Sequence, residues 1–440
     1  MSSRARTLIL ITAFGAVLFG VAMSAAGPRP VPGTPTSARS PLTQPVAATS
    51  NSPGSPNFTV SPAAESPSTE ERSAELALLA PDADLWSPPP GASARAPGTL
   101  VQAQQVIPTP PGLGAVYRVL YWSDSVDGRP ITVSGAVYLP AGRAPVEGWP
   151  VITWGRGTSG SADRCAPSRH IGEDTVPLDL ARRGFLVTAT DYQGLGTDGL
   201  QPYLVGDSEG RAMLDIVSAA DSVPGARATR SFAAWGHSQG GHAALFAREL
   251  SSDRLPDRPL VATVAMAPPS FIPQIVETWA LNVRAKALGI MALAGLTAAY
   301  PEARLDDLIT PQYLGAVREA LETGCTDDIN RRFADVPGDQ LFAVHPAMST
   351  PWGPLLHAQE PAQRAGTGPV VLVHGELDAT LPQAMSAAIE TQMCRRGEPV
   401  TRWLLQGQGH GEIIGAAWQD MVAWTSDRFA GRAPVASGCG

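Results

Sequence analysis

The chain has 440 residues, of which 44% are hydrophobic and 16% charged, and its formal net charge at pH 7 is −8. A chain of this length is too long for one small domain and can bury a large core. Its basic residues are almost all arginine, with Lys286 as the one lysine, and they form no basic tract. Composition therefore excludes an electrostatic nucleic-acid-binding surface, and we expect no nucleic-acid partner.

The first 26 residues have the layout of a secretory signal. Arg4 and Arg6 precede an apolar run from Leu8 to Met23, and the small residues Ser24–Ala26 follow. This order predicts export with cleavage after Ser24 or Ala26. The alternative is an uncleaved N-terminal anchor at the cell surface, because the run is almost long enough to span a bilayer.

Residues 27–80 are predicted to be a disordered linker. Ten of the 42 prolines lie between Pro28 and Pro67, among Ser, Thr, Ala and Gly. Such a composition cannot bury enough apolar surface to offset the entropy of ordering the chain. The folded domain is accordingly expected over residues 81–440.

The four cysteines are predicted to form two disulfides, because an exported protein leaves the reducing cytoplasm. Sequence alone allows three connectivities. The cysteines are Cys165, Cys325, Cys394 and Cys439.

Short apolar, β-branched runs alternate with helical stretches along the domain. This pattern predicts an α/β fold with a mainly parallel sheet covered on both faces. The first two predicted strands are expected to pair antiparallel around the Asp127–Gly128 turn, and residues 209–220 have the apolar spacing of a crossover helix. Strands are predicted over 115–122, 131–139, 150–154, 185–190, 231–235, 261–266, 369–374 and 400–405.

One interval, about 268–363, interrupts this alternation with no convincing strand. Helix-like pieces such as Trp279–Ala299 and Gln312–Thr323 lie there, separated by Pro and Gly. An insertion of this kind is expected to form a helical cap over the carboxyl edge of the sheet, where open α/β folds bind ligands.

Ser238 lies in the pentapeptide Gly236-His-Ser-Gln-Gly240, after a predicted strand and before a helix of small residues. This context indicates a nucleophile elbow, in which the serine adopts a strained conformation and the flanking glycines allow strand and helix to pack closely. The elbow exposes the hydroxyl and directs helix amides towards it.

Two similar patterns are interpreted differently. Ser208 is also flanked as G-x-S-x-G, but it follows the strand ending near Thr190 too closely for the crossover that a further parallel strand needs, so it is predicted to begin a helix. Residues Gly194–Gly199 match a dinucleotide fingerprint, yet Gln201-Pro202 stands where a helix should begin. No metal-ligand or phosphate-loop motif is present either, and we expect neither cofactor nor metal.

A serine nucleophile needs an imidazole base, itself oriented by a carboxylate. His410 lies in a glycine-rich loop after the last predicted strand, and Asp378 in the loop after the strand over 369–374. The order Ser238, Asp378, His410 is that of α/β-hydrolases. Glu376 is the rival acid, whereas His237 and His374 are expected to make structural hydrogen bonds.

The oxyanion of a tetrahedral intermediate requires backbone donors. We expect one from the amide of Gln239, directly after the nucleophile, and another from Thr158 or Ser159 in the glycine-rich loop after the strand over 150–154. Asp191 is expected to hold the neighbouring loops structurally, with Arg156 as its partner.

Several further segments of the domain are distinctive: Asp84–Pro90, Gly157–Gly160, Cys165–Ser168, Asp191–Gly194, Pro202–Gly206, Ser208–Arg211 and Trp235–His242. On these segments the sequence resembles the secretory lipase family, the lipase A-like α/β-hydrolases with a helical cap, from about Asp82 to Arg432. The resemblance implies hydrolysis of carboxylic esters, often acylglycerols, by Ser238, Asp378 and His410. It also implies the disulfides Cys165–Cys325 and Cys394–Cys439. The family usually has His where Arg156 stands.

These observations lead to the hypothesis of a secreted, monomeric serine esterase or lipase that acts on a small acyl ester or a lipid, at a lipid interface where the substrate forms one. Apolar residues over 285–299 either line an acyl-binding tunnel or pack within the cap. Two rival hypotheses remain: an acyltransferase or peptidase using the same three residues, and a non-catalytic surface protein with a hydrolase fold.

Overall fold

The computed structural model describes residues 84–281, 285–434 and 439. The predicted signal or anchor over 1–26 and the predicted linker over 27–80 lie outside the described residues. Every element below belongs to one compact unit, Thr69–Gly440. None of the described helices is long and apolar enough to cross a membrane.

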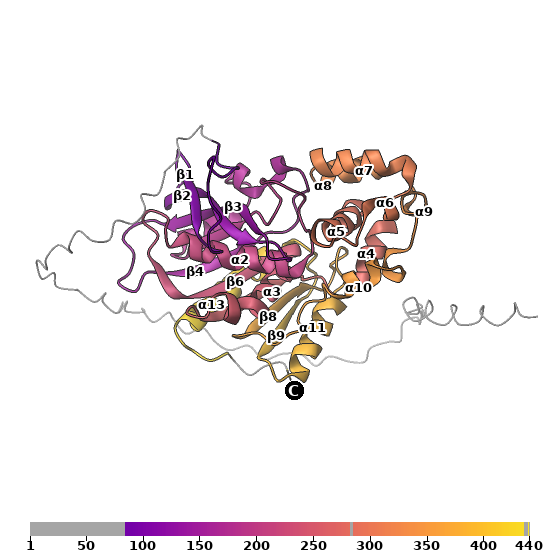
Figure 1. The fold of residues 1–440 in the computed structure, drawn as a ribbon. Coiled ribbons are helices and arrows are strands. Elements are labelled where there is room, and N and C mark those ends of the chain that lie inside the picture. Colours follow the sequence, from indigo (N-terminus) through magenta and orange to yellow (C-terminus); the bar gives the residue numbers. More distant parts are fainter. Residues whose placement is uncertain (1–83, 282–284, 435–438, 440) are drawn as a thin grey trace, which may run out of the picture. The chain divides into compact units, whose positions relative to one another are not determined.

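A nine-stranded, mostly parallel sheet organises the described residues, in the order β1-β2-β3-β5-β4-β6-β7-β8-β9 (Figure 1). The pairs β1–β2, β2–β3 and β3–β5 are antiparallel, and all later pairs are parallel. The strands are β1 (Leu100–Gln105), β2 (Leu113–Asp124), β3 (Pro130–Pro140), β4 (Trp149–Gly155), β5 (Leu186–Thr190), β6 (Ala228–His237), β7 (Leu260–Met266), β8 (Val370–Gly375) and β9 (Val400–Leu405).

All eight predicted strands are present, and β2 and β3 pair antiparallel up to Asp124 and Pro130 on either side of the predicted turn. The additional strand, β1, was not predicted because its sequence contains three glutamines. Gln102 is buried all the same, since its side-chain amide donates to the carbonyl oxygens of Leu85 (2.9 Å) and Ser87 (3.0 Å). Hydrogen bonds to a neighbouring segment thus compensate for a polar strand.

Helices cover both faces of the sheet. Side chains of α2 and α3 pack with β2, β3, β4 and β6 in one buried cluster, whereas α1, α12 and α13 pack with the opposite face in another. The helices outside the cap are α1 (Thr175–Arg182), α2 (Gly206–Ala220), α3 (Gln239–Arg254), α11 (Ala384–Arg395), α12 (Glu412–Ala416) and α13 (Trp418–Phe429), with short 3₁₀ turns at Asp163–Cys165 and Pro167–His170.

The described chain between β7 and β8 is helical, and Figure 1 shows its orange segments gathered at one side of the strands. The expected single piece Trp279–Ala299 is wrong, since two helices share it. They pack closely, and a Cβ on Gly289 would lie 2.5 Å from the backbone nitrogen of Ala280. The helices are α4 (Ile272–Leu281), α5 (Lys286–Ala299), α6 (Leu305–Leu308), α7 (Pro311–Thr323), α8 (Thr326–Phe333), α9 (Gly338–Leu341) and α10 (Trp352–His357), with a 3₁₀ turn at Pro346–Met348.

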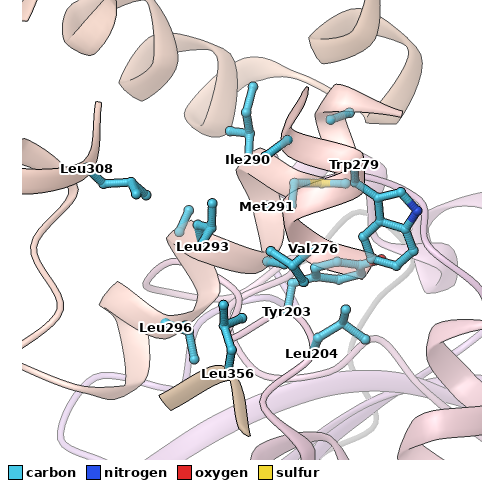
Figure 2. Close-up of a cluster of buried hydrophobic side chains, with 14 of the residues drawn as sticks. Tyr203, Leu204, Val276, Trp279, Ile290, Met291, Leu293, Leu296, Leu308 and Leu356 are labelled. Carbon is cyan, nitrogen blue, oxygen red and sulfur yellow. The ribbon is translucent and has the colours of Figure 1, made fainter. Parts of the chain in front are cut away.

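The cap has its own hydrophobic core, which Figure 2 shows in close-up. Tyr203 and Leu204, from the connection between β5 and α2, extend into it from the sheet domain. The cap is therefore joined to the domain by shared packing as well as by its two chain connections. The other labelled side chains are Val276, Trp279, Ile290, Met291, Leu293, Leu296, Leu308 and Leu356.

Candidate active site

Ser238 occupies a tight turn between β6, which ends at His237, and α3, which begins at Gln239. Its backbone has φ 57° and ψ −119°, a region that costs an ordinary residue about 1–3 kcal/mol. The turn needs its glycines, because a Cβ on Gly240 would lie 1.7 Å from the carbonyl oxygen of Gly155. The local structure is the elbow that the sequence predicts.

His410 lies in the loop between β9 and α12, and its Nδ1 is 2.7 Å from Oδ2 of Asp378. Ser238 and His410 line the same cavity, of about 470 Å³. Within the described residues no hydrogen bond joins their side chains, which is common before a substrate draws such groups together. The structure thus brings all three predicted residues to one site.

Asp378 is an ionised hydrogen-bond acceptor in this arrangement. Its Oδ1 accepts from the backbone nitrogens of Thr380 (2.9 Å) and Leu381 (2.8 Å), and its Oδ2 faces His374 Nε2 at 3.3 Å as well as His410. Burial alone would raise the pKa of Asp378, but the hydrogen bonds from His374 and His410 hold it below its ordinary value. The carboxylate is therefore fixed in orientation and charge.

The rival acid does not contact the imidazole. The Glu376 carboxylate accepts from the backbone nitrogen of Gly407 at 3.0 Å, on the loop that leads to His410. The geometry accordingly favours Asp378 over Glu376 as the partner of His410.

His237 and His374 make structural hydrogen bonds. His237 Nε2 is 2.8 Å from the carbonyl oxygen of His410, and His374 Nε2 is 2.9 Å from that of Leu381. Burial of the His237 ring and the nearby charge of His410 lower the pKa of His237 to about 4. A neutral His237 can therefore donate to the His410 backbone at ordinary pH and hold this loop in place.

The loop after β4 approaches the nucleophile. A Cβ on Gly157 would lie 3.8 Å from Cβ of Ser238, and Thr158 lines the Ser238 cavity, whereas Ser159 lines an adjoining one. Gln239 is buried at the start of α3, where backbone amides have no partner within the helix. Of the two loop candidates, Thr158 is thus the one that reaches the Ser238 cavity.

The expected pairing of Asp191 with Arg156 is wrong. Asp191 is fully buried and accepts from the hydroxyl groups of Ser134 and Ser168. Burial raises its pKa, although these hydrogen bonds oppose the effect. Arg156 instead faces Asp174, with Nε 3.5 Å from Oδ2, at the wall of the Ser238 cavity.

The two disulfides are Cys165–Cys325 and Cys394–Cys439, the pairing that the resemblance implies. The first joins the segment after Thr158 to the start of α8 in the cap. Beside it, the Thr326 backbone nitrogen donates to the Ser159 carbonyl oxygen at 3.1 Å. The loop next to Ser238 is therefore tied to the cap. Among residues 84–281, 285–434 and 439, no cluster of three or more His, Cys, Asp or Glu could hold a metal ion.

A mostly parallel sheet, helices on both faces and a serine elbow at the end of a central strand define an α/β-hydrolase fold. Residues 171–437, more than half of the chain, match the model of the family described as secretory lipase. The chain belongs to that family.

Two solved structures show how widely the fold is shared. Candida antarctica lipase A in its closed state has a TM-score of 0.69 and 16% identity, covering 82% of this chain and 90% of its own. The rice cell wall degrading esterase LipA from Xanthomonas oryzae has a TM-score of 0.63 and 22% identity, covering 76% of this chain and 97% of its own. At these identities the likeness concerns the fold alone.

A curated relative is a probable inactive lipase of Mycobacterium tuberculosis (strain CDC 1551 / Oshkosh). It is 26% identical over an alignment of 213 residues that covers 43% of this chain and 46% of the relative. The chain spans about half the length of this curated relative.

Sequence reasoning missed three buried or partly buried contacts of residues near Ser238. Tyr203 contacts Thr158, Glu209 contacts Gln239, and Gln359 contacts His242 on α3. Tyr203 and Glu209 lie in segments that carry the family resemblance, which was the available signal. Nothing local indicates Gln359, because its contacts with the sheet domain, to Gly206 and His242, are with residues more than 100 positions away.

Proposed function

We propose that the protein hydrolyses carboxylic esters through an acyl-enzyme formed on Ser238. The observation that carries the proposal is the 2.7 Å contact between His410 and an ionised Asp378, at a cavity that the strained Ser238 also lines. Family membership supports an ester hydrolase. The two disulfides and the signal-like N-terminus support an extracellular substrate.

The proposed reaction has two halves. Ser238 Oγ attacks the ester carbonyl while His410 Nε2 takes its proton, and the amides of Gln239 and Thr158 donate to the oxyanion. His410 then protonates the leaving alkoxide, which departs as the alcohol. Water, deprotonated by His410, attacks the acyl group and releases the acid and free Ser238. Asp378 stabilises the imidazolium in both halves.

The cavity supports esters with short acyl chains as substrates. Among the described residues, its apolar lining comprises Trp154, Val176, Leu288 and Ile414, and Arg156, Glu173 and Asp174 add charges. Most of α5 packs inside the cap core, so of the apolar stretch 285–299 only Leu288 lines the cavity. This supports the interpretation that residues 285–299 pack within the cap, and not that they line an acyl-binding tunnel. A long acyl chain would need an apolar lining along its length.

The name of the mycobacterial relative raises the alternative of a non-catalytic protein. In this chain the nucleophile elbow, the imidazole and the carboxylate are all present, and Ser238 and His410 line one cavity, which supports activity. An acyltransferase would use the same three residues. It would transfer the acyl group mainly to an added alcohol, whereas a hydrolase would transfer it mainly to water.

The test compares wild type with Ser238→Ala on p-nitrophenyl esters from acetate to palmitate. We expect kcat/KM to fall about a thousandfold or more when the nucleophile is removed. Ser208→Ala is the matched control, because Ser208 has the same G-x-S-x-G flanks but lies in the first turn of α2. Activity within a few fold of wild type in Ser238→Ala would refute the proposal.

A further inference from the structure

Glu209 is a buried carboxylate, 1% exposed, in the first turn of α2. Its Oε1 accepts from the Gln239 side-chain amide at 2.8 Å and from the Leu204 backbone nitrogen at 2.9 Å. Its Oε2 lies 3.0 Å from Nδ1 of His242. One carboxylate thus contacts both the start of α3 and the connection between β5 and α2.

These contacts lead to both proposed oxyanion donors. Gln239, which follows the nucleophile, is bound to Glu209 through its own side chain. Leu204 has a left-handed backbone, φ 58°, and the preceding Tyr203 accepts a hydrogen bond at its hydroxyl oxygen from the Thr158 hydroxyl at 2.9 Å. Glu209 therefore links the two backbone segments whose amides must converge on one oxygen atom.

The same carboxylate is coupled to the cap through His242, which is fully buried. His242 Nε2 is 2.8 Å from the carbonyl oxygen of Gln359, just after α10. The Gln359 side-chain oxygen accepts from the Gly206 backbone nitrogen at 3.1 Å, at the start of α2. The end of the cap is thereby fixed against the helix that carries Glu209.

A buried carboxylate is costly unless polar groups around it compensate for the lost water, and three polar groups from two segments contact Glu209. It is not among the residues that line the Ser238 cavity, so it acts through its neighbours. We propose that Glu209 is a positioning residue that sets the distance between the Gln239 and Thr158 amides for oxyanion binding. The inference rests on the proposed function.

The loss of kcat in Glu209 variants should depend on how many hydrogen-bond acceptors the new side chain retains. Glu209→Met removes every acceptor, and we expect kcat to fall about 10- to 100-fold with KM within about twofold. The reason is that displaced amides stabilise the oxyanion of the transition state less well, whereas binding of the uncharged ester changes little. Glu209→Gln should keep kcat within about fivefold. Its oxygen can still accept from Gln239, and its amide can donate to Nδ1 of His242 when the ring proton lies on Nε2.

The matched control is Asp215→Asn, on the same helix. Asp215 is 2% exposed and accepts from Ser123 and Arg254, away from the cavity. We expect this variant to lower the melting temperature and leave kcat within about twofold. Gln239→Met, which keeps the backbone amide and breaks only the link to Glu209, should lower kcat about tenfold and reports the same link if Glu209→Met fails to fold.

The decisive readout is the inhibition constant of an alkyl boronic acid, which adds to Ser238 as a tetrahedral anion. It should rise in Glu209→Met and Gln239→Met by the factor by which kcat/KM falls. Unchanged kcat and boronate affinity in both variants, or an equal loss in Asp215→Asn, would overturn the positioning role. A wild type that neither turns over esters nor binds the boronic acid would overturn the proposed function as well.

Discussion

The two disulfides should differ in what they contribute to activity. Cys165–Cys325 lies beside the loop that carries Thr158, and Gly160 and Cys325 form an isolated β-bridge there. Cys394–Cys439 instead packs with residues of α11 and of β7, β8 and β9, in a separate cluster. Replacing both cysteines of one disulfide with alanine gives two variants to compare. The Cys165/Cys325 variant loses a disulfide beside the Thr158 loop, and the Cys394/Cys439 variant loses one in a separate cluster.

The expected loss of stability follows from the loops that each bond closes. The sequence separations are 160 and 45 residues. In the chain-entropy model the longer loop gives about 5 kcal/mol at 25 °C and the shorter about 4 kcal/mol, a difference of about 1 kcal/mol. Both variants should thus lose stability, with the Cys165/Cys325 variant losing slightly more.

The assay pairs urea unfolding with ester hydrolysis at a temperature where both variants are folded. We expect kcat/KM to fall about tenfold in the Cys165/Cys325 variant, because the loop next to Ser238 loses its covalent tie to the cap. The Cys394/Cys439 variant should stay within about twofold of wild type. Equal losses of activity, or a larger loss of stability in the Cys394/Cys439 variant, would refute the reasoning.

Three further predictions concern single residues of the site. Asp378→Asn should lower kcat about 10⁴-fold, because an amide cannot hold His410 in the tautomer that accepts the serine proton, whereas Glu376→Gln should change kcat only a few fold; steady-state kinetics of both variants checks this. Leu288→Ala should raise the ratio of octanoate to butyrate hydrolysis by enlarging the apolar wall of the cavity, and an unchanged ratio would contradict the assigned wall. The pKa of His237 falls from 6.5 to about 4 on folding, so the unfolded chain binds more protons than the folded chain between these pH values. The free energy of unfolding should therefore decrease as the pH is lowered from 6.5 to about 4. Urea titrations of His237→Asn should show a weaker decrease over the same pH range.

Local patterns in the sequence sufficed for the strands β2 to β9 and for the elbow. Buried parallel strands are continuous apolar runs, and the elbow requires glycines on both sides of Ser238. The order Ser238, Asp378, His410 then follows from the succession of strands β6, β8 and β9, because each residue lies just beyond the carboxyl end of its strand. These features depend on neighbours along the chain.

Features that depend on distant partners could not be predicted. β1 is stabilised by hydrogen bonds from Gln102 to a preceding segment, and α4 packs so closely on α5 that a Cβ on Gly289 would lie 2.5 Å from the backbone nitrogen of Ala280. Asp191 was assigned a partner by charge, yet buried serine hydroxyl groups satisfy it. Only the folded structure shows such long-range pairs.

The central claim is that Ser238 carries the acyl group, and the mass of the trapped protein tests it most directly. Wild type mixed with excess p-nitrophenyl butyrate and quenched in acid should gain the mass of one butyryl group, located by peptide mapping on Ser238, and Ser238→Ala should gain none. Turnover without an adduct on Ser238, or an adduct on another residue that persists in Ser238→Ala, would contradict the account.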